Sequence, residues 1–223
     1  MRRFFLCVSL LLFATTLTCF SQQTEIDQFA VFSAYSYLGT PSLNLTQRGF
    51  DGDLGYNVRS WLTFGFDFSR LDGHTSLQPN DLNTTTLTAL APFLGFLPPG
   101  GTPYSISTYT YEGGPQINYR RLKKFTFFVR PALGALHANV KATPPAPIAP
   151  MLCGLLGGCA KSDTVPFYGF GGGVTWEINP HFGLRVASDF AHYDFFSGLL
   201  NGGRSSVRLS VGTKFGFGKN IVK

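Results

Sequence analysis

Residues 206–218 read SVRLSVGTKFGFG, and this stretch decides the fold class of the chain. Large or branched side chains occupy one set of alternate positions, and charged or small ones occupy the other. The two sets are Val207, Leu209, Val211, Thr213, Phe215 and Phe217 against Arg208, Ser210, Gly212, Lys214 and Gly216. A period of two is that of a β-strand with two chemically different faces. The stretch therefore predicts a long amphipathic strand.

The same alternation recurs upstream in five further segments. They start at Phe50, Trp61, Tyr109, Tyr168 and Phe182. Two weaker segments complete the set, because residues 29–38 are aromatic on both faces and Pro131 interrupts the pattern of residues 125–140. We interpret both as strands, since without them the strand count is six and the spacing of turns fails.

The connecting segments are alternately short and long. The short ones are residues 58–60, 120–124 and 179–181, and the long ones are 39–47, 71–104, 141–165 and 195–205. Strands of about 10 residues, joined by short turns at one end and longer loops at the other, are typical of transmembrane barrels. The sequence therefore predicts an all-β chain: an eight-stranded antiparallel up-and-down transmembrane β-barrel over residues 28–218.

Composition and the N-terminus agree with an exported membrane protein. Charged residues make up 13% of the chain, against about 25% in an ordinary soluble domain. Arg2 and Arg3, followed by an apolar stretch over residues 4–17, predict a cleaved signal peptide at residues 1–21. Cys19 as a lipoprotein acceptor is less favoured, because residues 16–18 form a poor recognition sequence. Without the signal, the formal charge of +6 falls to about +4, which is too mild to argue for nucleic acid.

Alternation alone does not say which face of a barrel looks outward. Three features favour lipid: charges lie on the face with small residues, a signal is present, and aromatic residues lie beside the short turns. These aromatic residues are Tyr56, Trp61, Tyr119, Trp176 and Phe182. We expect them to form a girdle at the periplasmic interface. The alternative is a secreted soluble lipocalin-like binding barrel.

Several stretches resemble the small outer-membrane β-barrel family typified by the OmpA transmembrane domain, in the single-domain form common in acidobacteria. They are VFSAYSYL, YTYEGGPQINYRR, FTFFVRPALGA, FYGFGGGVTWEINPHFGLRV and SVRLSVGTKFGFG. The resemblance covers about residues 28–218 and implies an integral outer-membrane location, with lipid, lipopolysaccharide and the outer-membrane assembly machinery as partners. Such barrels often end on Phe, whereas residues 219–223 follow Phe217 here. No peptidoglycan-binding domain follows, so the resemblance does not imply cell-wall tethering.

The small-residue face carries charges that we expect in the lumen. They are Asp51, Asp53, Asp67, Glu112, Arg130, Glu177, Arg185, Asp189, Arg208 and Lys214. Buried charges must be paired, and the predicted hairpins bring Glu112 near Arg130 and Asp189 near Arg208. Asp51 and Asp67 are expected to lie opposite each other. A closed lumen is favoured over a gated minor pore, because eight strands leave room for little more than side chains.

Two cysteines remain after signal removal. Cys153 and Cys159 form an even pair in an exported chain, which predicts a disulfide across the flexible GLLGG segment. Neither has a histidine or another cysteine at metal-ligand spacing, so no metal and no cofactor are expected.

Catalysis by this chain is the less favoured interpretation. His192 has Asp194 and Ser197 nearby, and His74 lies beside Asp72, but proximity in the sequence does not establish a catalytic triad. We expect a non-enzyme with a structural, adhesive or minor-pore role; a lipid-A-modifying hydrolase or acyltransferase is the alternative.

The long loops contain apolar segments at residues 91–101 and 147–158, which could bind a surface ligand or pack over the barrel mouth. Phe93, Phe96 and Leu97 are the residues to test. The sequence identifies neither a ligand nor an oligomeric state.

Overall fold

A computed structural model describes residues 23, 25–96, 100–144, 149–155 and 158–222 of the chain. Eight antiparallel strands follow one another in sequence order and close into a barrel, in which β1 pairs with both β2 and β8. The predicted fold class is therefore confirmed. The predicted signal peptide, residues 1–21, lies outside the described residues.

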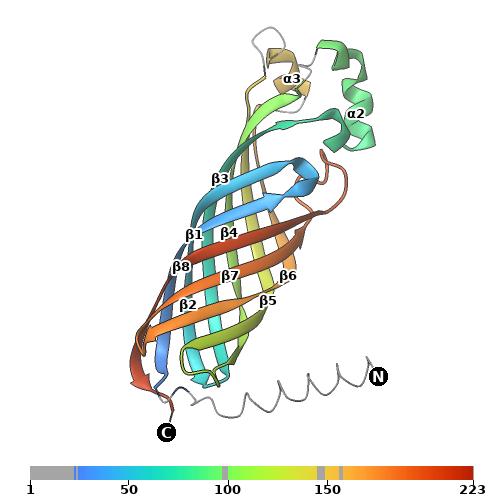
Figure 1. Ribbon diagram of the computed structural model, residues 1–223. Helices are drawn as coiled ribbons and strands as arrows, with labels where there is room; N and C mark the ends of the chain where they lie inside the picture. Colours follow the sequence, from blue (N-terminus) through green and yellow to red (C-terminus); the bar gives the residue numbers. More distant parts are fainter. Residues whose placement is uncertain (1–22, 24, 97–99, 145–148, 156–157, 223) are drawn as a thin grey trace, which may run out of the picture.

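The strands are long, and one end of the barrel carries the remaining secondary structure (Figure 1). The strands are β1 (Asp27–Thr40), β2 (Leu45–Arg59), β3 (Leu62–Leu77), β4 (Thr102–Tyr119), β5 (Phe125–Ala142), β6 (Ala160–Asn179), β7 (Phe182–Tyr193) and β8 (Arg204–Asn220). The helical elements are η2 (Pro41–Leu43), η3 (Pro79–Asp81), α2 (Thr84–Leu90), η4 (Ala91–Phe96) and α3 (Ala149–Leu155). We call the end with α2 and α3 the loop end, and the opposite end the turn end.

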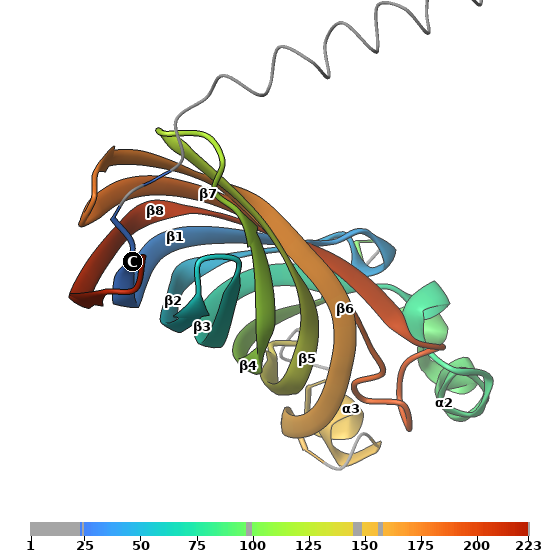
Figure 2. The ribbon, with the colours of Figure 1, turned by 90° about the horizontal axis from the view of Figure 1, so that it is seen from below.

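Alternation along each strand places one set of side chains outside and the other inside. In β8, Val207, Leu209 and Val211 are exposed whereas Arg208 and Ser210 are buried. In β1, which is aromatic on both faces, Tyr35 points outward and Phe32 lies inside at 3% exposure. Viewed from below, the strands follow one another around the barrel (Figure 2).

The loops at the loop end are shorter than the sequence predicts. The prediction of a long loop over residues 39–47 is wrong, because β1 continues to Thr40 and β2 begins at Leu45. The intervening turn begins with Pro41, and Asn44 adopts the left-handed conformation at φ 46°. Within the predicted 71–104 loop, residues 71–77 extend β3 and pair with β4. The β-ladder thus continues beyond the segments where the sequence alternates clearly.

The loops that remain contain short helices. Asn83 caps α2, since its side chain accepts a hydrogen bond from the Thr86 N–H at 2.8 Å. The Cys153–Cys159 disulfide is formed, as predicted, and joins α3 to the segment before β6. Among the described residues, no helix has the length and apolar character needed to cross a membrane.

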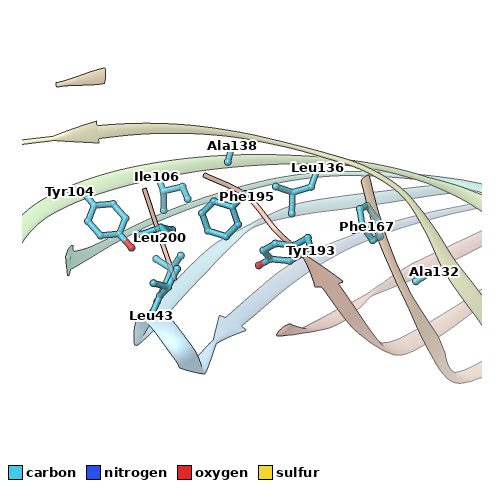
Figure 3. Close-up of a cluster of buried hydrophobic side chains, with 11 residues drawn as sticks. Leu43, Tyr104, Ile106, Ala132, Leu136, Ala138, Phe167, Tyr193, Phe195 and Leu200 are labelled. Carbon is cyan, nitrogen blue, oxygen red and sulfur yellow. The ribbon is translucent and has the colours of Figure 1, made fainter. Parts of the chain in front are cut away.

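The interior has two layers of different chemistry. Toward the turn end it is polar and charged, as predicted. Toward the loop end it is apolar, which corrects the expectation of a polar lumen throughout. The apolar layer consists of Leu43, Leu45, Tyr104, Ile106, Ala132, Leu136, Ala138, Phe167, Tyr193, Phe195 and Leu200 (Figure 3). Because the loop residues Leu43, Phe195 and Leu200 belong to this layer, the loops are packed into the barrel mouth.

Candidate functional site

The charged interior is the candidate functional site, and eight of its ten predicted residues form one group. We call this group the central cluster: Asp51, Asp53, Asp67, Glu112, Arg130, Arg185, Asp189 and Arg208. The other two, Glu177 and Lys214, pair nearer the turn end, where Lys214 Nζ donates to Glu177 Oε2 at 2.9 Å.

Arg130, on β5, reaches carboxylates from four other strands. Its Nη1 lies 3.2 Å from Asp53 Oδ2, and its Nη2 lies 3.0 Å from Asp67 Oδ2. Its Nε lies 3.4 Å from Glu112 Oε1, on the neighbouring strand, which is the pair the hairpin predicts. Nη2 also lies 3.1 Å from Asp189 Oδ1. Arg130 therefore joins opposite walls of the barrel, since Asp53 and Asp189 belong to β2 and β7.

Arg208, on β8, also contacts several carboxylates. Its Nη1 donates to Asp67 Oδ1 at 3.0 Å, and its Nη2 donates to Asp189 Oδ2 at 3.0 Å and to Glu112 Oε2 at 3.3 Å. The side chain is only 5% exposed. Because Arg130 and Arg208 share three carboxylates, the two guanidinium groups and their partners act as one hydrogen-bonded unit.

Arg185 is held differently from the other two arginines. Among the described residues, Asp53 is its one ionic partner, at 3.4 Å, and its Nε donates to Thr175 Oγ1 at 3.1 Å. Its guanidinium lies over the rings of Phe32 and Phe128, 5.1 and 4.8 Å from their centroids. Cation–π contacts of this kind stabilise a desolvated guanidinium. The inward Phe32, which blurs the alternation of β1, thus has a role inside the barrel.

One glycine makes room for the cluster. A Cβ built on Gly171 of β6 would overlap the Asp189 Oδ1 carboxylate oxygen. Asp189 is paired with Gly171 across the β6–β7 ladder, so a larger residue there would push the carboxylate away from Arg130 and Arg208.

The cluster contains more carboxylates than guanidinium groups. Asp51, Asp53, Asp67, Glu112 and Asp189 face only Arg130, Arg185 and Arg208, a formal surplus of two negative charges. Asp51 has the weakest ionic contact, 3.8 Å from Arg208 Nη1, and accepts a hydrogen bond from Ser210 Oγ at 2.6 Å. Breaking such a cluster is costly, because each unpaired carboxylate has lost its hydration.

The prediction that Asp51 lies opposite Asp67 is wrong, because the register of the β2–β3 ladder differs. Asp53 lies opposite Asp67, and Asp51 lies opposite Ser69. The β2–β3 turn is centred on Ser60 and Trp61, with an irregular pairing between Asn57 and Arg59, so the ladder is shifted by two residues.

A polar layer that is uncharged apart from Arg120 separates the central cluster from the turn end, and it was not predicted from the sequence. Thr63 Oγ1 donates to Asn57 Oδ1, and Asn118 Nδ2 donates to Thr63 Oγ1 at 2.8 Å. Gln116 and Arg120 complete it, donating to Asn118 and Asn57 at 2.6 and 2.9 Å. These residues alternate with outward aromatic residues, so the signal was present in the strand pattern.

Small spaces remain between the packed interior side chains. A void of about 20 Å³ lies at the boundary of the charged and apolar layers, beside Glu112, Arg208 and Phe167. Another of about 10 Å³ lies beside Asp53, Arg185 and Lys214. Each is comparable to the roughly 10–15 Å³ that a single water molecule requires.

At the turn end, His181 forms an ion pair with the first strand. Its Nδ1 lies 2.8 Å from Asp27 Oδ2. Gly216 leaves space for this carboxylate, because a Cβ there would overlap Asp27 Oδ2. The hydrogen bond to Asp27 and the negative charge of that residue raise the pKa of His181; Glu25 acts in the same direction and Lys214 against it.

This contact predicts a pH-dependent contribution to stability. A raised folded-state pKa means that the contribution is complete below the unfolded pKa of about 6.5 and is lost as pH rises through the folded value. Wild type should therefore exceed His181→Gln in urea midpoint at about pH 5.5 and match it at about pH 9. A difference that is equal at both pH values, or that is also seen with the β3 variant His74→Gln, would contradict the assignment.

The five predicted girdle residues lie on the outer surface close to the short turns. Tyr56, Trp61, Tyr119 and Trp176 are 43–49% exposed, and Phe182 is half-buried. Tyr56 pairs with Phe29 at a ring-centroid distance of 5.3 Å. The girdle's role as a membrane-interface anchor remains a prediction.

The residues of the two candidate catalytic groups have other partners. His192 Nδ1 lies 3.0 Å from Ser205 Oγ, across the β7–β8 ladder. Within the described part of the chain, no hydrogen bond or ion pair joins His192 to Asp194 or Ser197. Asp72, beside His74, accepts from Ser107 Oγ and pairs with Arg70. The described ranges contain no group of three or more histidine, cysteine or acidic side chains suited to a metal ion. Nothing is described of the side chains of Phe93 and Phe96, and Leu97 lies outside the described residues.

No protein-family model and no curated protein matches this sequence. Among solved structures, the fold is similar to that of Neisserial surface protein A, at TM-score 0.49 and 15% identity over 85% of this chain and 96% of that one. OprG from Pseudomonas aeruginosa gives TM-score 0.49 and 9% identity, covering 89% and 100%. Ail, the attachment invasion locus protein of Yersinia pestis, solved in complex with the heparin analogue sucrose octasulfate, gives 0.47 and 14%, covering 84% and 96%.

Proposed function

We propose that this chain is an integral outer-membrane protein that presents a structured loop end at the cell surface and whose lumen is closed. The observation that carries the proposal is its polarity: charges are buried inside while large apolar side chains face outward. Val129, Phe170 and Val211 are 60%, 67% and 59% exposed on different strands. A soluble monomer rarely exposes apolar patches larger than a few hundred Å². A surrounding bilayer accounts for such a surface.

The orientation of the barrel in the membrane follows from the lengths of its connecting segments. Short turns lie at the periplasmic side of such barrels and longer connections outside. The girdle of Tyr56, Trp61, Tyr119, Trp176 and Phe182 then lies at the periplasmic interface, and α2 and α3 lie at the cell surface. Outer-membrane lipid is the partner of the strand exterior, and lipopolysaccharide is the partner of the outer rim.

Closure of the lumen is supported by both interior layers. The central cluster ties β2, β3, β4, β5, β7 and β8 together across the lumen. Above it, the apolar layer fills the mouth with side chains from the loops. We infer a role in structure or surface adhesion, without catalysis and without a permanently open pore.

Two measurements on one preparation test this proposal. The mature chain, expressed in outer membranes, should give a heat-modifiable band in the membrane fraction when boiled and unboiled samples are compared on a denaturing gel. The purified protein in planar bilayers should show no steady ion conductance. A water-soluble product without a mobility shift would overturn the membrane location, whereas a stable open channel would overturn closure alone.

A further inference from the structure

A cavity of about 90 Å³ lies between the barrel mouth and the helical loops. Its walls are apolar and come from separate parts of the chain: Leu82 and Leu90 around α2, Tyr104 and Ala142 at the ends of β4 and β5, and Phe195 and Leu200 before β8. A sealed apolar cavity of about 150 Å³ accepts benzene, which sets the scale of hydrocarbon that such a space can hold. The space at the mouth therefore suits a short hydrocarbon segment.

A wider groove of about 470 Å³ adjoins the cavity. Both spaces are lined by Leu90, Phe196 and Leu199, which form their common boundary. The remaining surface of the groove includes the hydroxyl groups of Thr85, Thr86 and Ser162. The path from cavity to groove therefore leads from an apolar site to a more polar one.

Lys161 is the cation at this boundary, since it lines both spaces. It belongs to the inward set of positions on β6, together with Asp163, Val165 and Phe167. Asp163 accepts a hydrogen bond from the Phe196 N–H at 2.6 Å, and Asp81, on η3, accepts one from the Gln78 N–H at 2.9 Å. Within the described ranges, the Lys161 ammonium has neither a hydrogen bond nor an ion pair. Its charge is available to a ligand.

We propose that the cavity and groove together bind a free medium-chain fatty acid. The end of the acyl chain occupies the cavity among Leu82, Tyr104 and Leu200. The carboxylate lies in the groove, where the Lys161 ammonium and the Thr85 hydroxyl can donate to it.

The test uses decanoate with a photoreactive diazirine at the chain end, added to the mature protein in lipid nanodiscs. Cross-linking should be saturable and map to residues 77–90 and 194–203. Excess unlabelled decanoate should displace it. Probe that merely dissolves in the bilayer would instead label exterior positions such as Val129 and Phe170. The labelled peptides therefore distinguish probe bound in the cavity from probe dissolved in the bilayer.

Matched variants distinguish the contribution of the Lys161 charge from that of the cavity volume. Lys161→Gln should lower cavity labelling by decanoate about five-fold, the upper range for one exposed charge pair, and leave labelling by the analogous decanol unchanged. Lys141→Gln, on the outward face of β5, is its control. Ala142→Phe should fill the cavity and abolish labelling by both probes, whereas the exposed Ala160→Phe should not.

Labelling confined to the exterior, or equal in all variants, would overturn the proposal. Equal loss of decanoate and decanol labelling in Lys161→Gln would overturn the carboxylate assignment. The inference does not depend on the membrane location, because a soluble barrel would keep the same cavity and the same labelled peptides.

Discussion

Replacing Arg208 by methionine should lower the free energy of unfolding by about 3–5 kcal/mol, the usual cost of removing one partner from a buried ionic network. Asp67, Glu112 and Asp189 would each lose a guanidinium contact of 3.0–3.3 Å without regaining water. Urea unfolding in lipid vesicles, followed by the folded band on an unboiled gel, measures the change.

The surface supplies the control for this experiment. Arg70 pairs with Asp72 at 3.6 Å, and both side chains are about half exposed. Arg70→Met should therefore change stability by about 0–1 kcal/mol. Because Asp51 belongs to a surplus of negative charge, Asp51→Asn added to Arg208→Met should recover part of the loss. If Arg208→Met were as stable as Arg70→Met, the central cluster would not stabilise the fold.

Replacing Val129 by arginine should destabilise the protein by about 2–4 kcal/mol, even though the native side chain already faces outward. Val129 is 60% exposed in the middle of the apolar band on β5. Its replacement would place a guanidinium in hydrocarbon. In a water-soluble barrel, the same exposed substitution would change stability by only about 0.5 kcal/mol.

Asn139 offers a matched position on the same strand. It is exposed on the same face of β5 as Val129 but lies toward the loop end. Asn139→Arg should have little effect if the bilayer ends below it. Refolding yield and urea midpoint in vesicles distinguish the two variants. Equal small effects would contradict a lipid-facing exterior and would favour a soluble barrel.

Strand number and side-chain direction could be predicted from the sequence because both follow from a local period of two. Arg208 and Val211 differ by three positions, which is enough to assign them to opposite faces. The contacts of Arg130 with Asp53 and Asp189 could not be predicted in this way. They cross the lumen between strands that are not neighbours, so they depend on the width and stagger of the closed barrel.

Two errors have specific physical causes. The β2–β3 turn is centred on Ser60 and Trp61 instead of the predicted residues 58–60. This shift, with the irregular pairing between Asn57 and Arg59, moved the partner of Asp67 from Asp51 to Asp53. The apolar layer was not predicted because charged side chains served as the signal for the inward face. The inward set of β5 turns apolar beyond Arg130, at Ala132, Leu136 and Ala138, and that signal was available. The loop packing of Phe195 and Leu200 was not, since it depends on tertiary contacts.

The distribution of the central cluster's charges among the strands affects how the barrel assembles. All five carboxylates and two of the three guanidinium groups lie on β2 to β7, whereas Arg208 is carried by the last strand. A sheet that lacks β8 therefore holds five carboxylates and only two guanidinium groups of the cluster. This surplus of negative charge favours the entry of water or protons between the strands. Docking of β8 against β1 supplies the third base at the same moment as it seals the backbone seam. Electrostatic neutralisation and ring closure thus become a single cooperative event, and an assembly intermediate stalled before it should be more acid-tolerant than the finished protein.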